Sequence, residues 1–354
     1  MMSFGSSPVI GLDIGTSAVR AAQVGSGRSG RTLASFGQVP LPPGAVADGE
    51  IRDAAAVSDA ITQLWKRAKL KSKRAVIGVA NQRVVVRQVD LPFLEEKEFR
   101  NSLRFQVADH IPMSADDAEL DFQIIEDFMT ESGEHMMRIL LVAAARDMVE
   151  SFVGVATAAG LSPVGVDLTP FAVARAISSS ARGEMGVGGA EAVVDVGAGV
   201  TNIVVHHNGE PRFVRILLVG GDDATGALAK EFDLSFEEAE AVKFDLGRGV
   251  GSPEALGVLR ERVTALVEEV RGSIDYYLSQ DDSEAITSII VTGGGSLTPG
   301  LAEQLETVSG LQVQRGTSLA DMNIAKSGLT QEQAVQIEPV AAAAVGLAIG
   351  ASAK

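Results

Sequence analysis

Apolar residues fall into short runs that are separated by glycine turns, which predicts strands alternating with helices. The segment from Val9 to Val24 is an apolar run, a Gly-Thr-Ser turn and a second apolar run, the pattern of a β-hairpin. The segment from Glu191 to His206 repeats this design, with Asp195 in the place that Asp13 has in the first copy. The two aspartates are about half the 354-residue chain apart, so we expect a duplicated two-domain α/β protein.

Between the two copies the pattern changes to a helix, a hairpin and a second helix. Apolar residues at helical spacing predict a helix from Glu95 to His110 that ends near Pro112. Two predicted strands, 120–128 and 136–145, follow it, and a helix at 147–159 completes a compact insert. The second copy is followed by predicted helices at 222–231, 235–244 and 253–279 and by a strand at 286–291.

These elements divide the chain into four parts. We expect a first domain at 7–93 and 161–180, an inserted subdomain at 94–160, a second domain at 190–220 and 285–350, and a helical subdomain at 221–284. The small residues at 178–183 and 186–189 are typical of a linker between the two halves.

The charge and residue types exclude several classes of function. Acidic residues outnumber basic ones 46 to 30, and the resulting net charge of −16 disfavours general binding to nucleic acid. There is no cysteine, so disulfides and thiolate metal sites are excluded. The chain begins without the basic and apolar regions of a secretory signal, and the apolar segment 339–353 is too short to span a bilayer. We therefore expect a protein that is not integral to a membrane.

Three glycine-rich turns carry the candidate chemistry. The first contains Asp13, Gly15, Thr16 and Ser17; the second contains Asp195, Gly197, Gly199 and Thr201; the third contains Gly293, Gly294, Gly295 and Ser296. Backbone N–H groups at such turns bind phosphate oxygens, and consecutive glycines let the backbone approach a flat ligand closely. One such turn alone is equally typical of a plain hairpin, but three in this order predict an ATP site.

The order of the motifs resembles that of the superfamily of actin, heat-shock chaperones and sugar kinases. The first and second turns resemble its two phosphate motifs, and the third resembles its adenosine motif. The segment 167–172 resembles the first connecting helix, and Glu338-Pro339 with 344–348 resembles the second. The resemblance implies a ribonuclease H-like duplicated fold with bound ATP and Mg²⁺, in which Asp13 and Asp195 hold the metal through water.

Three further residues have roles implied by this resemblance. Glu240 and Lys243 match the spacing of an acid and a lysine on the adenosine-contacting helix, and the alternative is a solvent-facing ion pair. Asp167 is the candidate for positioning the water that attacks the γ-phosphate. If Asp167 packs as a helix cap instead, the protein is a nucleotide-held scaffold with weak hydrolysis at most.

The insert narrows the resemblance to one branch of the superfamily. Its position, together with Val89-Asp90-Leu91-Pro92, His110-Ile111-Pro112 and 166–172, resembles the PilM family of type IV pilus assembly proteins, which is related to the cell-division protein FtsA. FtsA usually ends in a basic amphipathic membrane helix, whereas this chain ends Ile349-Gly-Ala-Ser-Ala-Lys354. The resemblance implies a cytoplasmic protein at the inner face of the plasma membrane that links the pilus platform to its motor.

The implied partner is a PilN-like membrane protein, bound through its cytoplasmic N-terminal peptide in a groove between the first domain and the insert. The candidate groove residues are Arg83, Val85, Arg87, Phe105 and Ile111, each with a structural role as the alternative. Two other functions stay open. A filament-forming protein like FtsA or actin would pellet with nucleotide alone, and a small-molecule kinase would need a polar sugar pocket, which the Ala-rich connecting helices offer little of.

Overall fold

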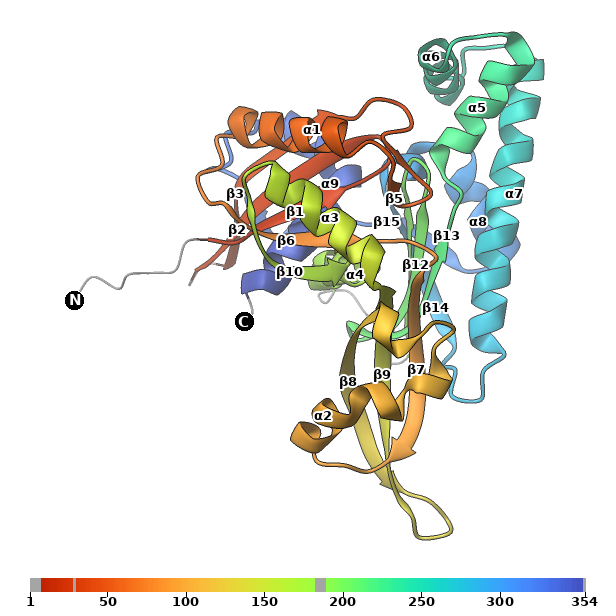
Figure 1. The fold of residues 1–354 in the computed structure, drawn as a ribbon. Coiled ribbons are helices and arrows are strands. Elements are labelled where there is room, and N and C mark those ends of the chain that lie inside the picture. Colours follow the sequence, from red (N-terminus) through yellow and green to blue (C-terminus); the bar gives the residue numbers. More distant parts are fainter. Residues whose placement is uncertain (1–7, 28–29, 182–188, 353–354) are drawn as a thin grey trace.

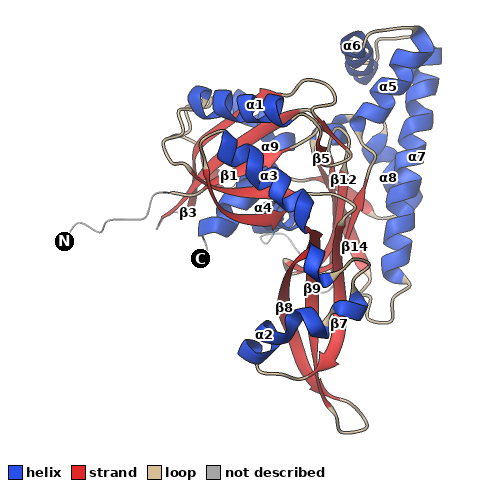
Figure 2. Cartoon of the chain, in the orientation of Figure 1, coloured by secondary structure: helices blue, strands red, loops and turns tan. Residues whose placement is uncertain are grey.

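A computed structural model describes residues 8–27, 30–181 and 189–352. It contains two larger sheets of similar topology, each with three antiparallel strands beside parallel ones (Figures 1 and 2). In the first, β1 (Ile10–Ile14) runs antiparallel to β2 (Ala18–Gly27) and parallel to β6 (Arg74–Val79). In the second, β11 (Ala190–Val196) runs antiparallel to β12 (Thr201–His207) and parallel to β14 (Ile286–Thr292). This correspondence confirms the predicted duplication.

The remaining strands complete these two sheets. The first sheet also contains β3 (Gly30–Pro40), β10 (Ser162–Leu168) and β16 (Met322–Asn323), and the second contains β13 (Glu210–Leu217) and β15 (Gln312–Arg315). Two short strands, β4 (Val46–Ala47) and β5 (Glu50–Ile51), form a small ribbon.

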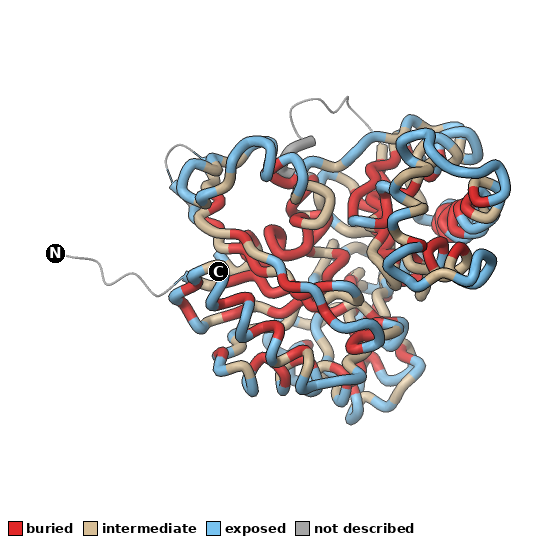
Figure 3. The backbone as a smooth tube through the Cα atoms, turned by 90° about the horizontal axis from the view of Figure 1, so that it is seen from above, coloured by how far each residue is buried: buried red, intermediate tan, exposed pale blue. Residues whose placement is uncertain are grey.

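Two helices lie between the two larger sheets and pack against both of them. They are α4 (Thr169–Ala181) and α9 (Gln331–Ser352), and they share a core with Val24 of the first sheet and Val193 of the second. The outer face of the first sheet is covered by α1 (Ala54–Arg67) and α3 (Arg146–Ala158), and that of the second by α7 (Pro253–Leu278) and α8 (Leu301–Ser309). Buried residues are concentrated in the strands and in the helices between the sheets, and Figure 3 shows them in the interior of the molecule.

The helical subdomain consists of α5 (Gly221–Phe232) and α6 (Phe236–Gly247), which lie beside the N-terminal end of α7 (Figure 1). Ser235 begins α6 with a capping box, in which its hydroxyl accepts from the N–H of Glu238 and the carboxylate of Glu238 accepts from the N–H of Ser235. The sequence predicts this start because Ser and Glu stand three residues apart.

The inserted subdomain is a three-stranded sheet with one helix. Its strands are β7 (Val84–Pro92), β9 (His135–Ala145) and β8 (Ala118–Met129), in that order, and α2 (Glu96–Gln106) packs on them with two short 3-10 helices, η1 (Ala108–His110) and η2 (Ala115–Asp117). Phe99 of α2 meets Phe122 of β8 edge to face, with 4.7 Å between the ring centroids.

The limits of this subdomain differ from the expected 94–160. Strand β7 pairs with β9 throughout its length and so belongs to the insert, although it precedes residue 94. Helix α3 precedes residue 160 but packs on the core of the first domain through Phe152 and Val155. The expected linker also differs, because residues 178–181 are the last residues of α4, while 182–188 lie outside the described residues.

The prediction that the apolar segment 339–353 is too short to span a membrane is wrong, because the helix that contains it begins earlier in the chain. Helix α9 has 22 residues and is apolar enough to cross a bilayer by composition. Half of its most apolar window is buried inside the protein, and residues 341–349 pack against α4 and the first sheet. The apolar character of α9 is explained by its place in the core between the two halves.

Candidate functional site

Two aspartates, Asp13 buried and Asp195 half-buried, lie near the ends of equivalent strands. In the first half, Asp13 of β1 is in register with Arg20 of β2, and the Nη1 of Arg20 donates to Oδ2 of Asp13 at 3.3 Å. In the second half, Asp195 of β11 is in register with Asn202 of β12, and the Nδ2 of Asn202 donates to Oδ2 of Asp195 at 2.9 Å. The duplication therefore places a carboxylate and a polar partner at the same position of each sheet.

The pKa values show that these carboxylates lie within electrostatic reach of one another. Burial raises the pKa of Asp195 to about 6; the hydrogen bond from Asn202 opposes this, the charge of Asp13 adds to it and the charge of Arg20 lowers it. Burial also raises the pKa of Asp13, against the charge and hydrogen bond of Arg20. Because burial disfavours the ionised forms of both carboxyl groups, the site is suited to a cation, which would stabilise those forms.

The raised pKa predicts a dependence of stability on pH in the absence of nucleotide. A carboxyl group with a raised pKa in the folded state stabilises the fold below its unfolded pKa near 3.8, and this contribution is lost as the pH rises through about 6. We expect Asp195→Asn to match the parent near pH 4 and to be more stable by about 2 to 3 kcal/mol at pH 7.5. Urea unfolding at both pH values measures this, and equal stability of variant and parent at pH 7.5 would contradict it.

The two glycine turns of these hairpins face each other across the halves. Each is closed by one backbone bond, from the N–H of Gly15 to the carbonyl of Ala18 at 3.1 Å and from the N–H of Gly197 to the carbonyl of Val200 at 2.9 Å. A Cβ atom on Gly199 would lie 3.0 Å from Oγ1 of Thr16, so the turns approach within contact distance. The residues of the two predicted phosphate motifs are therefore brought together.

The third turn packs against the second. Gly293 has a φ of +85°, and a Cβ on it would lie 2.6 Å from Oδ1 of Asp195. A Cβ on Gly295 would lie 2.5 Å from the carbonyl oxygen of Gly197. Contact with protein atoms thus requires two of the three glycines, whereas the sequence pattern suggested only close approach of a ligand.

Two predicted hydroxyls are used inside the protein. Thr201 is fully buried, and its Oγ1 donates to the carbonyl of Val219 at 2.7 Å. Ser296 is buried, and its Oγ donates to the carbonyl of Gly293 at 2.6 Å. Both side chains fix the shape of the turns, while Thr16 and Ser17 remain partly or fully exposed at the first turn.

Glu240 and Lys243 lie beside the third turn. The Nζ of Lys243 donates to Oε1 of Glu240 at 2.6 Å, to Oγ1 of Thr225 at 2.7 Å and to the carbonyl of Gly221 at 3.1 Å. A Cβ on Gly221 would lie 3.2 Å from the Cα of Gly295. The Lys243 side chain is only 13% exposed, so the alternative of a solvent-facing pair is wrong for the lysine.

Asp167 lies in register with Gly78 of β6, which is itself in register with Asp13. Its Oδ2 accepts from Nη1 of Arg175 on α4 at 2.9 Å, and the same nitrogen donates to the carbonyl of Gly346 on α9 at 3.0 Å. The carboxylate of Asp167 thus connects β10 to the two helices between the halves. Its role as a water-positioning residue stays a prediction.

Sequence reasoning missed three polar residues at this site. Arg20 Nε, Asn202 Oδ1 and Thr292 Oγ1 are buried atoms without a hydrogen-bond partner in the structure, and Thr292 is in register with Asp195. Arg20 and Asn202 each follow their aspartate by seven residues, a repeated spacing that could have identified them. Buried polar atoms without partners are costly, so these atoms favour a polar ligand at the site.

The residues present fit a nucleotide with its metal. Backbone turns that approach one another offer N–H groups to phosphate, Arg20 and Lys243 supply positive charge, and two carboxylates match the preference of Mg²⁺ for oxygen ligands and retained water.

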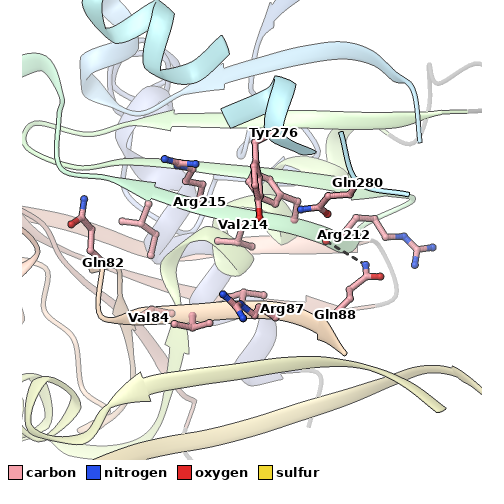
Figure 4. A pocket seen from close by; sticks show the side chains of 13 residues that line it. Gln82, Val84, Arg87, Gln88, Arg212, Val214, Arg215, Tyr276 and Gln280 are labelled. Atoms are coloured by element: carbon pink, nitrogen blue, oxygen red, sulfur yellow. Dashed lines mark hydrogen bonds between the residues drawn. The ribbon is translucent and has the colours of Figure 1, made fainter. Parts of the chain in front are cut away.

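The predicted partner residues are not all brought together. Val85 and Arg87 line a cavity of about 620 Å³ between β7 and β13 (Figure 4). Arg83 forms ion pairs with Asp147 and Glu50, and Ile111 is buried in the core of the insert. Phe105 is 88% exposed on α2 and does not line the cavity. The other wall of this cavity is the second domain, whereas the resemblance implied the first.

Comparison with known proteins identifies the family. The family model of type IV pilus assembly protein PilM matches residues 11–352, nearly the whole chain. The chain belongs to the PilM family. A solved structure of a PilM-PilN type IV pilus biogenesis complex is similar to this chain with a TM-score of 0.85, 27% identity and coverage of 98% of each chain.

More distant relatives place the PilM family within the actin-like fold. The cell division protein FtsA of Streptococcus pneumoniae is 24% identical over 350 residues, covering 86% of this chain and 74% of FtsA. MreB5 of Spiroplasma citri bound to ADP has a TM-score of 0.52 at 14% identity, covering 88% of this chain and 92% of MreB5. The predicted actin-like duplicated fold and its PilM-type insert are confirmed.

Proposed function

We propose that this protein is an ATP-binding scaffold of the type IV pilus inner-membrane platform, which binds the cytoplasmic N-terminal peptide of a PilN-like membrane protein. One observation supports the proposal that the protein binds ATP. The turns after Asp13 and Asp195 face each other, and buried polar atoms without hydrogen-bond partners lie beside them. Membership of the PilM family, and the likeness to a PilM-PilN complex, support the partner.

The nucleotide-binding residues divide by chemistry. The N–H groups of Gly15 and Gly197 close their own turns, so the remaining backbone N–H groups, at 16–17 and 198–199, would donate to the phosphates, with Arg20 beside them. Asp13 and Asp195 would accept hydrogen bonds from water on Mg²⁺, which supplies charge neutralisation to the phosphates when bound. Glu240 and Lys243, next to Gly293–Ser296, would contact the adenosine.

Hydrolysis is proposed to be weak at most. A hydrolysing enzyme must direct a polar side chain at a water in line with the γ-phosphate. The candidate, Asp167, already accepts a hydrogen bond from Arg175 and one from the N–H of Leu168. A carboxylate held in this way connects β10 to α4 and α9. This structural role favours a nucleotide-binding scaffold over an enzyme that hydrolyses ATP.

The proposed place of action is the inner face of the plasma membrane, reached through the partner. In the described residues, the helix long enough to cross a bilayer is α9, and it lies in the core between the halves. Attachment through a membrane protein's peptide, with a further link to the pilus motor, fits this arrangement. A filament like those of FtsA is the second candidate, because FtsA proteins are similar over most of the chain.

One binding experiment tests the two parts separately. In calorimetry with Mg·ATP we expect a 1:1 complex, and in a second titration we expect binding of a synthetic N-terminal peptide of the PilN-like protein from the same genome. A scrambled peptide of the same composition is the control. Binding of scrambled and native peptides with equal affinity would contradict the partner, and nucleotide-dependent pelleting without peptide would favour the filament.

A further inference from the structure

The loop between α1 and β6, together with the last turn of α1, carries a group of exposed basic side chains. We call residues 66–73 the basic loop, and its exposed basic residues are Lys66, Arg67, Lys69, Lys71 and Lys73. No aspartate or glutamate occurs between Asp59 and Asp90, although the chain as a whole has a net charge of −16. In the described part of the chain, no ion pair joins these five side chains to a carboxylate.

The backbone of the basic loop is held in one shape by its other residues. Leu70 and Ser72 are buried, while the three lysines that alternate with them are exposed. The indole Nε1 of Trp65 donates to the carbonyl of Ser72 at 2.8 Å, and the N–H of Ser162 on β10 donates to the carbonyl of Lys73 at 2.7 Å. The buried residues therefore fix the loop so that its lysines point to solvent.

Lys69 occupies a backbone position that favours glycine. Its φ is +52°, and its N–H donates to the carbonyl of Lys66 at 3.3 Å, while the N–H of Leu70 donates to the carbonyl of Trp65 at 3.0 Å. These two bonds form the Schellman motif that ends α1, in which glycine is the usual residue at the left-handed position. A lysine there keeps a positive charge at a cost in stability, which is typical of a functional residue.

The basic loop lies at the edge of the first sheet opposite the nucleotide site. Strands β1, β6 and β10 are parallel, and the loop leads into the start of β6, whereas Asp13 is near the end of β1. These strands begin on the side of the first domain that faces away from the second sheet (Figure 1). No charged residue occurs between Glu150 and Asp167, which include the end of α3 and the start of β10 beside the loop. A ligand at this edge would leave the glycine turns open.

The residue types of the basic loop favour a ligand with spread negative charge. Four of the five basic residues are lysines, whose ammonium groups act as hydrated point charges. Bidentate recognition of a single carboxylate or phosphate uses the planar guanidinium of arginine instead. Each lysine or arginine near an anionic bilayer strengthens binding about fivefold. The net charge of −16 repels such a bilayer from other faces, so the molecule would approach it with this edge.

We infer that the basic loop contacts the anionic headgroups of a lipid bilayer directly, with the nucleotide site at the far edge of the same sheet. This contact goes beyond attachment through a partner's peptide, because it requires no second protein. Its failure in the tests below would leave peptide capture and ATP binding unaffected.

The first test is sedimentation of the full chain with vesicles, without any partner. One set of vesicles is phosphatidylcholine alone, and in the other about one lipid in three is phosphatidylglycerol. We expect binding to the anionic vesicles that is at least about tenfold stronger than to the neutral ones and that weakens as salt is added. Equal binding to both sets, or binding to neither, would overturn the lipid contact. So would binding to polyglutamate without binding to anionic vesicles, because it would favour an acidic protein segment.

The second test removes the three loop charges. The triple variant Lys69→Gln, Lys71→Gln, Lys73→Gln changes exposed side chains only, and its melting temperature shows whether it folds like the parent. We expect it to bind anionic vesicles about 100-fold more weakly than the parent at low salt, since three cations are lost.

The matched control removes three exposed basic charges from α2, α5 and α7, through Lys97→Gln, Lys230→Gln and Arg260→Gln. It has the same net charge as the loop variant and is expected to bind vesicles like the parent. An equal loss of binding in both triple variants would overturn the site, because it would show an effect of total charge.

The third test uses the backbone of Lys69 to separate charge from stability. Lys69→Gly removes one cation but places glycine at the left-handed position, so we expect a melting temperature at or above that of the parent and about fivefold weaker binding to anionic vesicles. A lower melting temperature with unchanged vesicle binding would assign Lys69 to structure and overturn its part in the lipid contact.

Discussion

Asp195→Asn is expected to weaken Mg·ATP binding by about 10- to 100-fold. The half-buried carboxylate of Asp195 faces the first half of the chain, where the charges of Asp13 and Arg20 act on its pKa. Asparagine keeps the size of the side chain and one oxygen, but it removes the negative charge that would order water on the metal. Calorimetry with Mg·ATP at pH 7.5 measures the loss.

A matched control separates this effect from a general change of charge. Asp281→Asn removes one negative charge from an exposed loop after α7 and is expected to bind like the parent. Unfolding cannot explain a loss at Asp195, because the same variant is expected to be more stable than the parent at this pH. A residue that decreases stability and increases binding is typical of a functional site. Equal affinity of Asp195→Asn and the parent would show that the metal-phosphate site lies elsewhere.

Gly346→Ala is expected to destabilise the protein by about 3 kcal/mol or more, with a loss of folding as the extreme. Gly346 lies where α9 crosses α4, and a Cβ atom there would overlap the carbonyl oxygen and carbon of Ala172. Because both atoms belong to the backbone of a buried helix, the overlap can be relieved only by moving α4 and α9 apart. Urea unfolding, or the melting temperature where unfolding is irreversible, measures the effect.

The control is a helical glycine without such a neighbour. Gly257 lies on the exposed face of α7, and a Cβ there would meet nothing within 4 Å. Gly257→Ala should raise stability by up to about 1 kcal/mol, since alanine favours helix. A melting temperature of Gly346→Ala equal to that of the parent would contradict the tight crossing of α4 and α9.

The duplication and the turns could be predicted because their signals are local. A strand, a glycine turn and a strand within about 15 residues determine a hairpin, and two copies predict two sheets. The limits of the insert could not be predicted in this way. Strand β7 joins the insert through pairing with β9, about 50 residues later, and the apolar stripe of α3 does not say which core it covers.

The sequence predicted which turns come together, but not how their side chains are used. Residue type alone does not distinguish a hydroxyl that binds phosphate from one that binds its own backbone, as Thr201 and Ser296 do. Nor does it distinguish an apolar groove residue from a core residue, which is why Ile111 was named as a partner contact. Arg20 carries a signal in the repeated seven-residue spacing, which becomes evident once the halves are aligned by their aspartates.

The most direct measurement is a crystal structure of the protein with Mg²⁺ and a non-hydrolysable ATP analogue. We expect its phosphates between the Gly15–Ser17 and Gly197–Gly199 turns, the metal near Asp13 and Asp195, and the adenosine beside Lys243 and Gly294. Electron density for the nucleotide at any other place on the molecule would contradict the site shared by the two halves. So would the absence of the nucleotide from a crystal grown at a saturating concentration of the analogue.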